Sequence, residues 1–332
     1  MELTLSDIGW QAHPEVWLLV IGIAVLAGYV WRVVQPKAVA AGYEPITGRQ
    51  RLWFLLGLVG LWVASDWPVH DVAEEYLYFV HMAQHLFISM IIPLLFLLSM
   101  PRWLFDLLFP RDGAAYRFLR RASRPIVAGL VFNALTLVLH WPNVVQASFD
   151  SGPIHFILHL LVFAAGLLMW MPVVGPVRSW RLSPIGQCIF LFMMSIVPTV
   201  PSGWLVFAED VAYRHYDTAD RLWGVGVLTD QQAAGVVMKL VGGFFLWAVI
   251  VVIFARWAIA EGEAEAEARR ARGRALVAAA DRAAAEAGNL DDGGPEGQAD
   301  RTADRGPDGR PLTFESVAEE FARTEAPAEP RP

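Results

Sequence analysis

The feature that most constrains this chain is a series of seven apolar blocks near the length, about 20 residues, that an α-helix needs to cross a bilayer. The blocks are Glu15–Val34, Leu52–Ala64, Tyr76–Leu98, Ile126–His140, Ile154–Met171, Ile185–Phe207 and Ala233–Ala255. They are continuous instead of alternating, which excludes the strands of a β-barrel. The sequence therefore predicts an all-α integral membrane protein, a seven-transmembrane-helix bundle. Pro93, Pro198 and Pro201 lie inside two of the blocks and are expected to kink those helices.

Basic and acidic residues alternate between the links that join these blocks. The links at residues 32–51, 100–125 and 172–184 carry arginine or lysine, and so does the segment after the last block. The links at residues 66–75 and 209–230 are acidic. Cytoplasmic loops carry an excess of Lys and Arg. The sequence therefore predicts that the N-terminus lies outside the membrane and the C-terminus in the cytoplasm.

The composition changes after the last block. Residues 1–256 are expected to form the seven-helix membrane domain, and residues 257–287, rich in Ala, Glu and Arg, a charged cytoplasmic helix. Residues 288–332 are rich in Gly, Pro, Asp and Glu and are expected to be a disordered acidic tail. The net charge of −7 comes largely from this tail and the outer loops, so no nucleic-acid partner is expected.

Histidines are concentrated on the predicted outer side. His81 and His85 form an i,i+4 pair in the third block, and His155 and His159 form another in the fifth. Such pairs lie on one helix face, about 6 Å apart along the axis. His140 ends the fourth block at a similar depth. If these faces converge, five imidazoles surround one outer cavity.

Ionisable residues inside membrane helices usually face the bundle interior and mark function. Neutral imidazole is a common ligand of copper, zinc, iron and nickel. The two pairs and His140 therefore predict a metal or cofactor site, with packing or interhelical hydrogen bonding as the alternative. The other three histidines are interpreted mainly as loop residues; they are His13, His70 and His215.

Five further residues are candidates for a supporting role. Asp66 and Asp230 lie near the outer ends of helices, where a carboxylate can orient a ligating imidazole or cap a helix. Met82 and Met238 are candidate soft ligands for Cu(I), or packing residues. Lys239 can reach the outer surface, pair with a buried acid or repel a second cation.

Several of these segments resemble one known family. The stretch HMAQHLFISMIIPLLFLLSMP, the HWP at residues 140–142, the HFILH pair and the TDQQAAGVVMK stretch before the last block are similar to CtaG-type cytochrome c oxidase assembly factors. The resemblance covers residues 15–255, and the long charged tail departs from it. It implies a seven-span bacterial plasma-membrane protein that helps to build active haem–copper oxidase, at the copper-loading stage. It implies a role for His81, His85, His140, His155, His159 and Asp230.

The resemblance also implies partners. They are one or more cytochrome c oxidase subunits and a copper donor protein, in addition to the lipid bilayer; a homo-oligomer is also open. On this hypothesis the protein is a metallochaperone of respiratory chain biogenesis and not an enzyme. Copper is its expected metal.

Two other classes remain open on the sequence. One is a seven-span zinc-dependent hydrolase, with three histidine ligands and Asp230 or Asp66 as the base. The other is a haem-binding membrane protein with paired axial histidines. A retinal-type receptor is a more distant alternative, because Lys239 lies near the outer end of its block.

Overall fold

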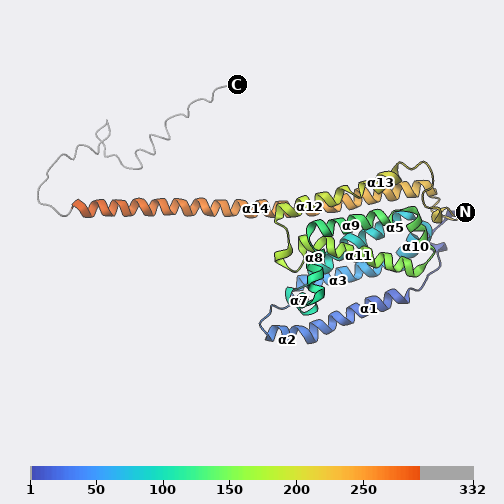
Figure 1. Ribbon diagram of the computed structural model, residues 1–332, viewed down its shortest axis with the longest axis horizontal. Helices are drawn as coiled ribbons and strands as arrows, with labels where there is room; N and C mark the ends of the chain where they lie inside the picture. Colours follow the sequence, from blue (N-terminus) through green and yellow to red (C-terminus); the bar gives the residue numbers. More distant parts are fainter. Residues whose placement is uncertain (1, 292–332) are drawn as a thin grey trace, which may run out of the picture. The chain divides into compact units, whose positions relative to one another are not determined.

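The computed structural model describes residues 2–291. The chain divides into two compact units, residues 1–262 and 263–332. The first unit is the helical bundle of Figure 1. In the second, the described residues continue helix α14 (Val227–Asp291), which contains the expected charged helix at 257–287. The predicted disordered tail lies, from residue 292 on, outside the described residues.

Five helices are long and apolar enough to cross a membrane, namely Pro14–Ala40, Tyr78–Ser99, Gly152–Val174, Pro184–Val206 and Val227–Ala285. Two bent pairs raise the number to seven if each pair is one span: Gly48–Ser65 with Val69–Tyr76, bent by 51°, and Ala114–Ala122 with Pro125–Leu139, bent by 78°. Each of the seven predicted blocks overlaps one of these helices. The structure therefore supports a multi-span helical membrane protein with five to seven spans.

The apolar side chains on the outside of the bundle fit this assignment. Leu18, Ile126 and Phe244 are 73%, 77% and 70% exposed. A soluble protein rarely exposes large contiguous apolar surfaces. Lipid tails are the medium in which such surfaces are stable.

Proline and side-chain caps set where many of the helices begin. Pro14, Pro125, Pro142 and Pro184 occupy the first turns of their helices, where the missing N–H has no intrahelical partner to lose. Thr47 caps α3 (Gly48–Ser65) in a capping box with Gln50. The local sequence alone therefore fixes these helix starts.

Proline also interrupts two of the long helices, as predicted. Before Pro93 the chain forms a π-helical turn, η4 (Phe87–Ile91), in which the Ile92 amide donates to Phe87 O five residues back. The widened turn joins α5 (Tyr78–Leu86) to α6 (Ile92–Ser99). The second interruption, at Pro198, separates α12 (Pro184–Ile196) from α13 (Thr199–Val206).

Helix α11 (Gly152–Val174) lies inside the bundle, packed against α9 (Pro125–Leu139), α6 and η4 (Figure 1). Gly166 makes this packing close, because a Cβ there would lie 2.0 Å from Ser89 O. One turn later the fully buried Trp170 donates from Nε1 to Met90 O at 2.8 Å. The π-helical turn and α11 are therefore joined by backbone proximity and by a buried hydrogen bond.

The remaining elements are short or peripheral. Helix α1 (Pro14–Tyr29) continues through η2 (Val30–Val34) into α2 (Gln35–Ala40), and α1 packs against α3. The others are β1 (Glu2–Leu3), η1 (Leu5–Asp7), α4 (Val69–Asp71), η3 (Val72–Tyr76), α7 (Arg102–Leu108), α8 (Ala114–Ala122), α10 (Pro142–Phe149), η5 (Arg178–Trp180), η6 (Arg214–Tyr216) and β2 (Arg221–Leu222). Strands β1 and β2 pair in parallel and join the N-terminus to the loop before α14.

Candidate metal centre

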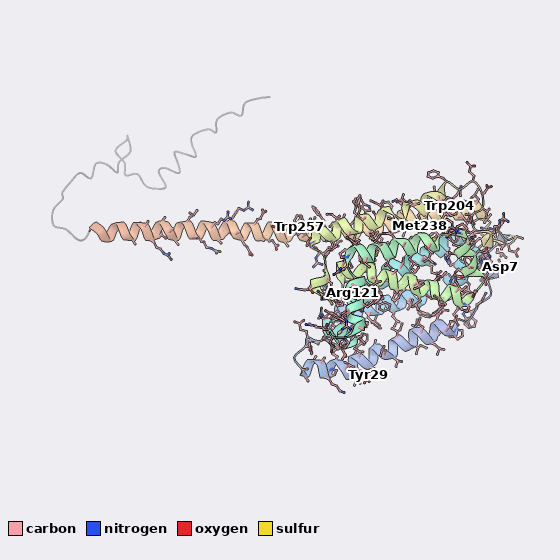
Figure 2. All side chains as sticks on the ribbon, in the orientation of Figure 1. Asp7, Tyr29, Arg121, Trp204, Met238 and Trp257 are labelled. Atoms are coloured by element: carbon pink, nitrogen blue, oxygen red, sulfur yellow. The ribbon has the colours of Figure 1, made fainter. Side chains whose placement is uncertain are left out.

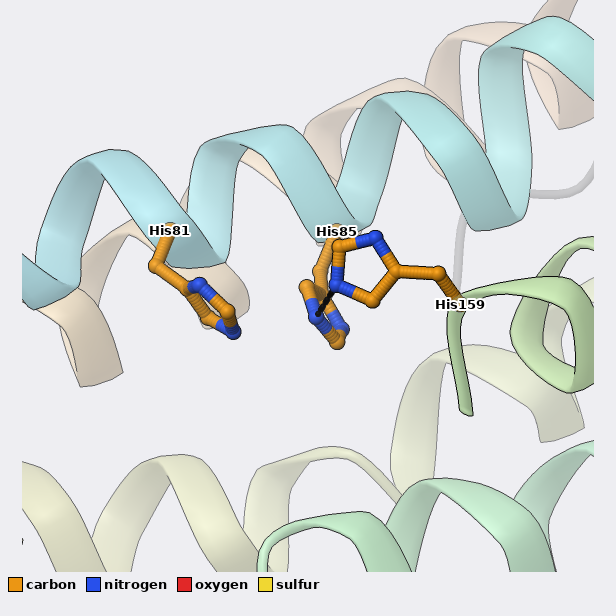
Figure 3. Close-up of side chains that lie close together, drawn as sticks. All are labelled: His81, His85 and His159. Carbon is orange, nitrogen blue, oxygen red and sulfur yellow. Dashed lines mark hydrogen bonds between the residues drawn. The ribbon is translucent and has the colours of Figure 1, made fainter. Parts of the chain in front are cut away.

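The two predicted histidine pairs face each other across the bundle. Helix α5 carries His81 and His85 with ring centroids 4.4 Å apart, and α11 carries His155 and His159 with centroids 4.2 Å apart. Across the helices, the His85 and His159 centroids are 4.7 Å apart, and both His155 and His159 lie 6.0 Å from His81. Figure 3 shows the His85 and His159 rings pointing toward each other. The structure thus brings four of the five predicted imidazoles into one cluster.

The spacing of the nitrogens suits a shared ion. One ligand atom from each of His81, His85 and His159 can be chosen so that all three lie within 4.8 Å of one another. His85 Nε2 and His159 Nε2 are 3.1 Å apart. Two nitrogens that each lie about 2.0 Å from a tetrahedral metal are about 3.3 Å apart. The two nitrogens are within hydrogen-bond distance of each other, and their separation is close to that of two ligands on one metal.

Glu74, in the middle of η3, completes the cluster and was not predicted from the sequence. Its Oε1 lies 2.9 Å from His155 Nε2 and 3.4 Å from His81 Nδ1. With His155 and His159 it forms a second group that meets the same 4.8 Å criterion. Its only sequence signal is its position in an acidic link seven residues before His81. The acidic charge of that link predicts only its side of the membrane, and the local sequence does not indicate that Glu74 contacts the histidines.

His140 lies beside the cluster without belonging to either group. Its Nδ1 donates to Thr136 O at 2.6 Å, which assigns the proton of the neutral ring to Nδ1. Its buried Nε2 has no hydrogen-bond partner among the residues that the structure describes. An unpartnered buried lone pair is costly unless something binds it. His140 is therefore available as a further ligand.

Two small cavities adjoin the imidazoles. The larger, about 60 Å³, is lined by His85 and His140 together with Met82, Met238 and Lys239. The smaller, about 20 Å³, shares His85, His140 and Met82. These volumes hold a few water molecules or an ion, whereas pockets for cofactor-sized ligands measure roughly 300 Å³ or more. The thioethers predicted as soft ligands therefore lie on the wall of the same space as the imidazoles.

Lys239 has its own partners in this wall. Its Nζ donates to Thr199 Oγ1 at 2.5 Å and to Ser195 O at 3.4 Å. The ammonium group is thereby held against the α12–α13 break. It places an ammonium group in the lining of the larger cavity, which also contains His85 and His140.

The two aspartates that were expected to support the ligands, Asp66 and Asp230, form their hydrogen bonds outside the cluster. Asp66 accepts hydrogen bonds from Trp17 Nε1, Trp62 Nε1 and the Trp67 amide at 2.9, 2.6 and 2.9 Å. It therefore fastens α1 to α3 and does not contact the cluster directly.

Asp230, which is fully buried on α14, caps the N-terminus of another helix, α5. Its two oxygens accept from the Tyr78 and Phe79 amides at 2.9 and 3.0 Å, and Arg221 lies 3.6 Å away. The N-cap residue of α5, Leu77, has no side-chain oxygen to satisfy these first-turn amides. Asp230 supplies that cap from another helix and so fixes the start of the helix that carries His81 and His85.

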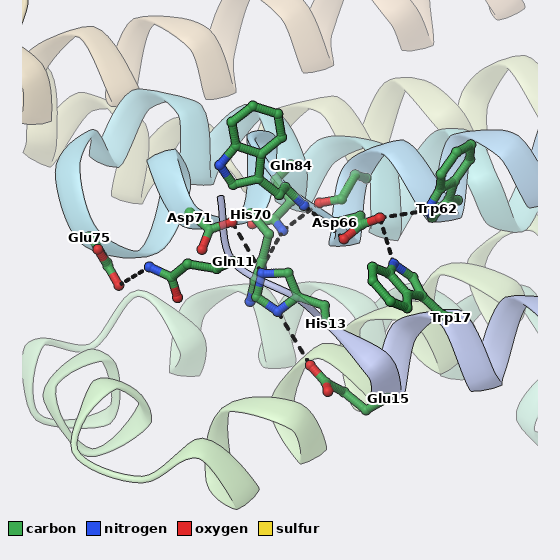
Figure 4. A network of polar contacts seen from close by, with 12 residues as sticks. Gln11, His13, Glu15, Trp17, Trp62, Asp66, His70, Asp71, Glu75 and Gln84 are labelled. Atoms are coloured by element: carbon green, nitrogen blue, oxygen red, sulfur yellow. Dashed lines mark hydrogen bonds and ion pairs between the residues drawn. The ribbon is translucent and has the colours of Figure 1, made fainter. Parts of the chain in front are cut away.

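A second polar network lies beside the N-terminal end of α1 (Figure 4). His70 Nδ1 lies 3.1 Å from Gln84 Nε2, and His13 Nε2 lies 3.1 Å from Asp71 Oδ2. Burial lowers the pKa of His13, but the hydrogen bond and charge of Asp71, aided by Glu15, outweigh it and leave the pKa above its ordinary value. These histidines, interpreted as loop residues from the sequence, are ordered by the fold beside the predicted ligands.

His215 is also ordered by its surroundings. Its ring stacks on Phe149 with centroids 3.8 Å apart, and its Nε2 lies 2.8 Å from Glu74 O. It therefore holds the backbone of Glu74 in place. Gln231 acts in a similar way on the same loop, because its side chain bonds the Ala212 and Tyr213 amides.

Apolar helices that enclose four histidines and a glutamate at one end of a bundle define a multi-span membrane protein with a candidate metal centre. Residues 27–260, more than half of the chain, match the sequence model of the family described as cytochrome c oxidase caa3 assembly factor, and the chain belongs to that family. The family resemblance inferred from the histidine segments is thus confirmed. No curated protein and no solved structure matches the chain.

Proposed function

We propose that this member of the caa3 oxidase assembly factors binds copper as its cargo at the cluster of His81, His85, His155, His159 and Glu74 and delivers it to an oxidase subunit. The proposal rests mainly on one observation. Helices α5 and α11, which are far apart in the sequence, each contribute two imidazoles, and η3 contributes a carboxylate, to one cluster inside an apolar bundle. Polar side chains are costly there unless they are paired or bind an ion. A haem–copper oxidase is the kind of client that needs such an ion.

The chemistry of the donors favours copper among the metals that bind imidazole. Imidazole and thioether together suit Cu(I), and Met82 and Met238 line the cavity that His85 and His140 share. Delivery requires exchangeable ligands instead of a closed tetrahedral cage. The two overlapping groups that share His159 offer an ion alternative coordination within one cluster.

We further propose seven spans with the cluster on the extracytoplasmic side of a bacterial plasma membrane. Figure 2 shows Asp7 at one end of the bundle and Arg121 at the other. The basic links contain Arg121, and the positive-inside rule directs such links to the cytoplasm. The cluster lies near the start of α5, which follows an acidic link. A copper donor and the copper-accepting oxidase subunit would then meet the protein from the outer side.

The first test is the metal content of the purified wild-type protein beside the double variant His81→Ala/His85→Ala, after equilibration with Cu(I), Zn(II) or haem. We expect the wild type to retain copper and the variant to lose it while staying in the membrane. Zinc retained in its place would point to the hydrolase, and a haem absorption band to the cytochrome. Absence of copper binding in the wild type would overturn the proposal.

A second test uses two adjacent glutamates. Glu74→Gln removes the carboxylate charge between His81 and His155, and the expected loss of copper affinity is about 10- to 100-fold, the usual effect of losing a partner of a ligating imidazole. Glu75→Gln is the matched control, because the exposed Glu75 contacts Gln11. Equal copper affinity in the two variants would remove Glu74 from the site.

A further inference from the structure

A line of imidazoles leads from the outer surface to the buried cluster. His13 and His70 have ring centroids 5.0 Å apart, and His70 and His155 have centroids 6.2 Å apart. From His155 the line continues through His159 to His85 in steps of 4.2 and 4.7 Å. Five consecutive rings from four separate segments of the fold are thus arranged in series.

Each step is short enough for two neighbouring rings to hold one ion. A metal lies about 2 Å from a ligating nitrogen, and the nitrogen lies about 1 Å from the ring centre. Two imidazoles that share an ion therefore have centroids up to about 6 Å apart. The spacings are 5.0, 6.2, 4.2 and 4.7 Å, so the longest step, between His70 and His155, fits only an ion held in a straight line between the two nitrogens. An ion can then pass along the line by ligand exchange without a fully unliganded state.

Carboxylates accompany the outer rings. Glu15, whose side chain is 64% exposed, lies 3.3 Å from His13 Nδ1, and Asp71 lies 3.1 Å from His13 Nε2. Further in, Glu74 contacts His155. A row of negative charge beside a narrow polar path attracts and concentrates cations.

We propose that His13 and His70 are transfer ligands, which pass copper between the outer surface and the buried cluster. The proposal rests on the proposed function, because it assigns a route to the same copper site. Gln84 Nε2 donates to Ala64 O and to His70 Nδ1, so the neutral His70 ring carries its proton on Nε2, and it binds an ion by giving up either this proton or the Gln84 hydrogen bond. The two residues are placed to govern the rate of copper exchange, whereas the cluster sets the affinity.

The experiment measures the rate and the amount of copper taken up by the full-length protein in detergent from a coloured, weak Cu(I)–chelator complex. His70→Asn keeps an acceptor for the Gln84 amide but removes the imidazole, and His13→Gln keeps a donor for the Asp71 carboxylate but removes the imidazole. We expect both variants to bind as much copper as the wild type at equilibrium. We expect loading to be slower by about tenfold, comparable to the effect of losing one ordering contact at a metal site.

Two comparisons separate a transfer role from a structural one. His70→Cys restores a soft ligand without restoring the shape of the ring, so it should recover most of the loading rate. Glu75→Gln is the control, because the exposed Glu75 contacts Gln11 and none of the aligned rings. It should load at the wild-type rate.

The outcomes distinguish this proposal from the function on which it rests. Equal loading rates in the wild type, His70→Asn and His13→Gln, with normal copper content, would overturn the route and leave the copper site intact. Slow loading that His70→Cys fails to restore would show that His70 acts through structure alone. A wild type that takes up no copper would overturn both proposals.

Discussion

Replacing Asp230 with alanine tests whether the cluster depends on a helix cap supplied from another helix. The change removes the acceptor of two first-turn amides of α5, at Tyr78 and Phe79, and leaves Arg221 without its carboxylate. Each buried N–H left without a partner costs about 1–3 kcal/mol. The two together cost about 2–6 kcal/mol of unfolding free energy, before any cost from the unpaired guanidinium.

The copper site should weaken together with the helix start. His81 lies on the first turn of α5, whose amides Asp230 holds, so a frayed start moves that ring away from Glu74 and His155. We expect Asp230→Ala to lower copper affinity by about 10- to 100-fold, as for the loss of other groups that orient ligands. Asp230→Asn keeps one acceptor oxygen and should lose less of both stability and affinity.

The assay combines thermal unfolding in detergent with copper titration for the wild type, Asp230→Asn and Asp230→Ala. Asp217→Ala is the control, because Asp217 is an exposed acid in the segment that precedes α14. If Asp230→Ala melted at the wild-type temperature and bound copper with unchanged affinity, the buried aspartate would not set the start of α5. The reasoning would then be refuted.

Two further predictions concern packing and pH. Gly166→Ala places a Cβ 2.0 Å from Ser89 O and should destabilise the bundle by about 3 kcal/mol or more in chemical unfolding. Gly243→Ala is the control, because the space around it is open, and its stability should be close to that of the wild type. Equal stability of the two variants would contradict the close approach of α11 to η4. The raised pKa of His13 means that its pairing with Asp71 stabilises the fold most below the ordinary value of 6.5, and that the stabilisation is lost as pH rises through the raised value. The difference in melting temperature between wild type and His13→Gln should therefore be largest at about pH 5.5 and shrink as the pH rises above 6.5, and a difference that grows with pH would contradict this assignment.

The family and the helical class were readable from the sequence because both depend on local patterns. Apolar blocks of membrane length predict helices whatever they pack against, and Pro93 and Pro198 interrupt them where a proline removes a backbone donor. The i,i+4 spacing places His81 beside His85, and His155 beside His159, on any helix. These features depend only on neighbours along the chain.

The tertiary structure decided which of these faces meet. Helix α11 approaches the widened turn η4 closely because Gly166 lacks a Cβ opposite Ser89, and a helix face carries no sequence mark of its partner. The same packing brings Glu74 to the histidines and directs Asp230 to the amides of another helix. The histidine pairs were therefore fixed by helical periodicity, whereas the cluster they form arises from contacts between residues far apart in the chain, which depend on shape and close packing.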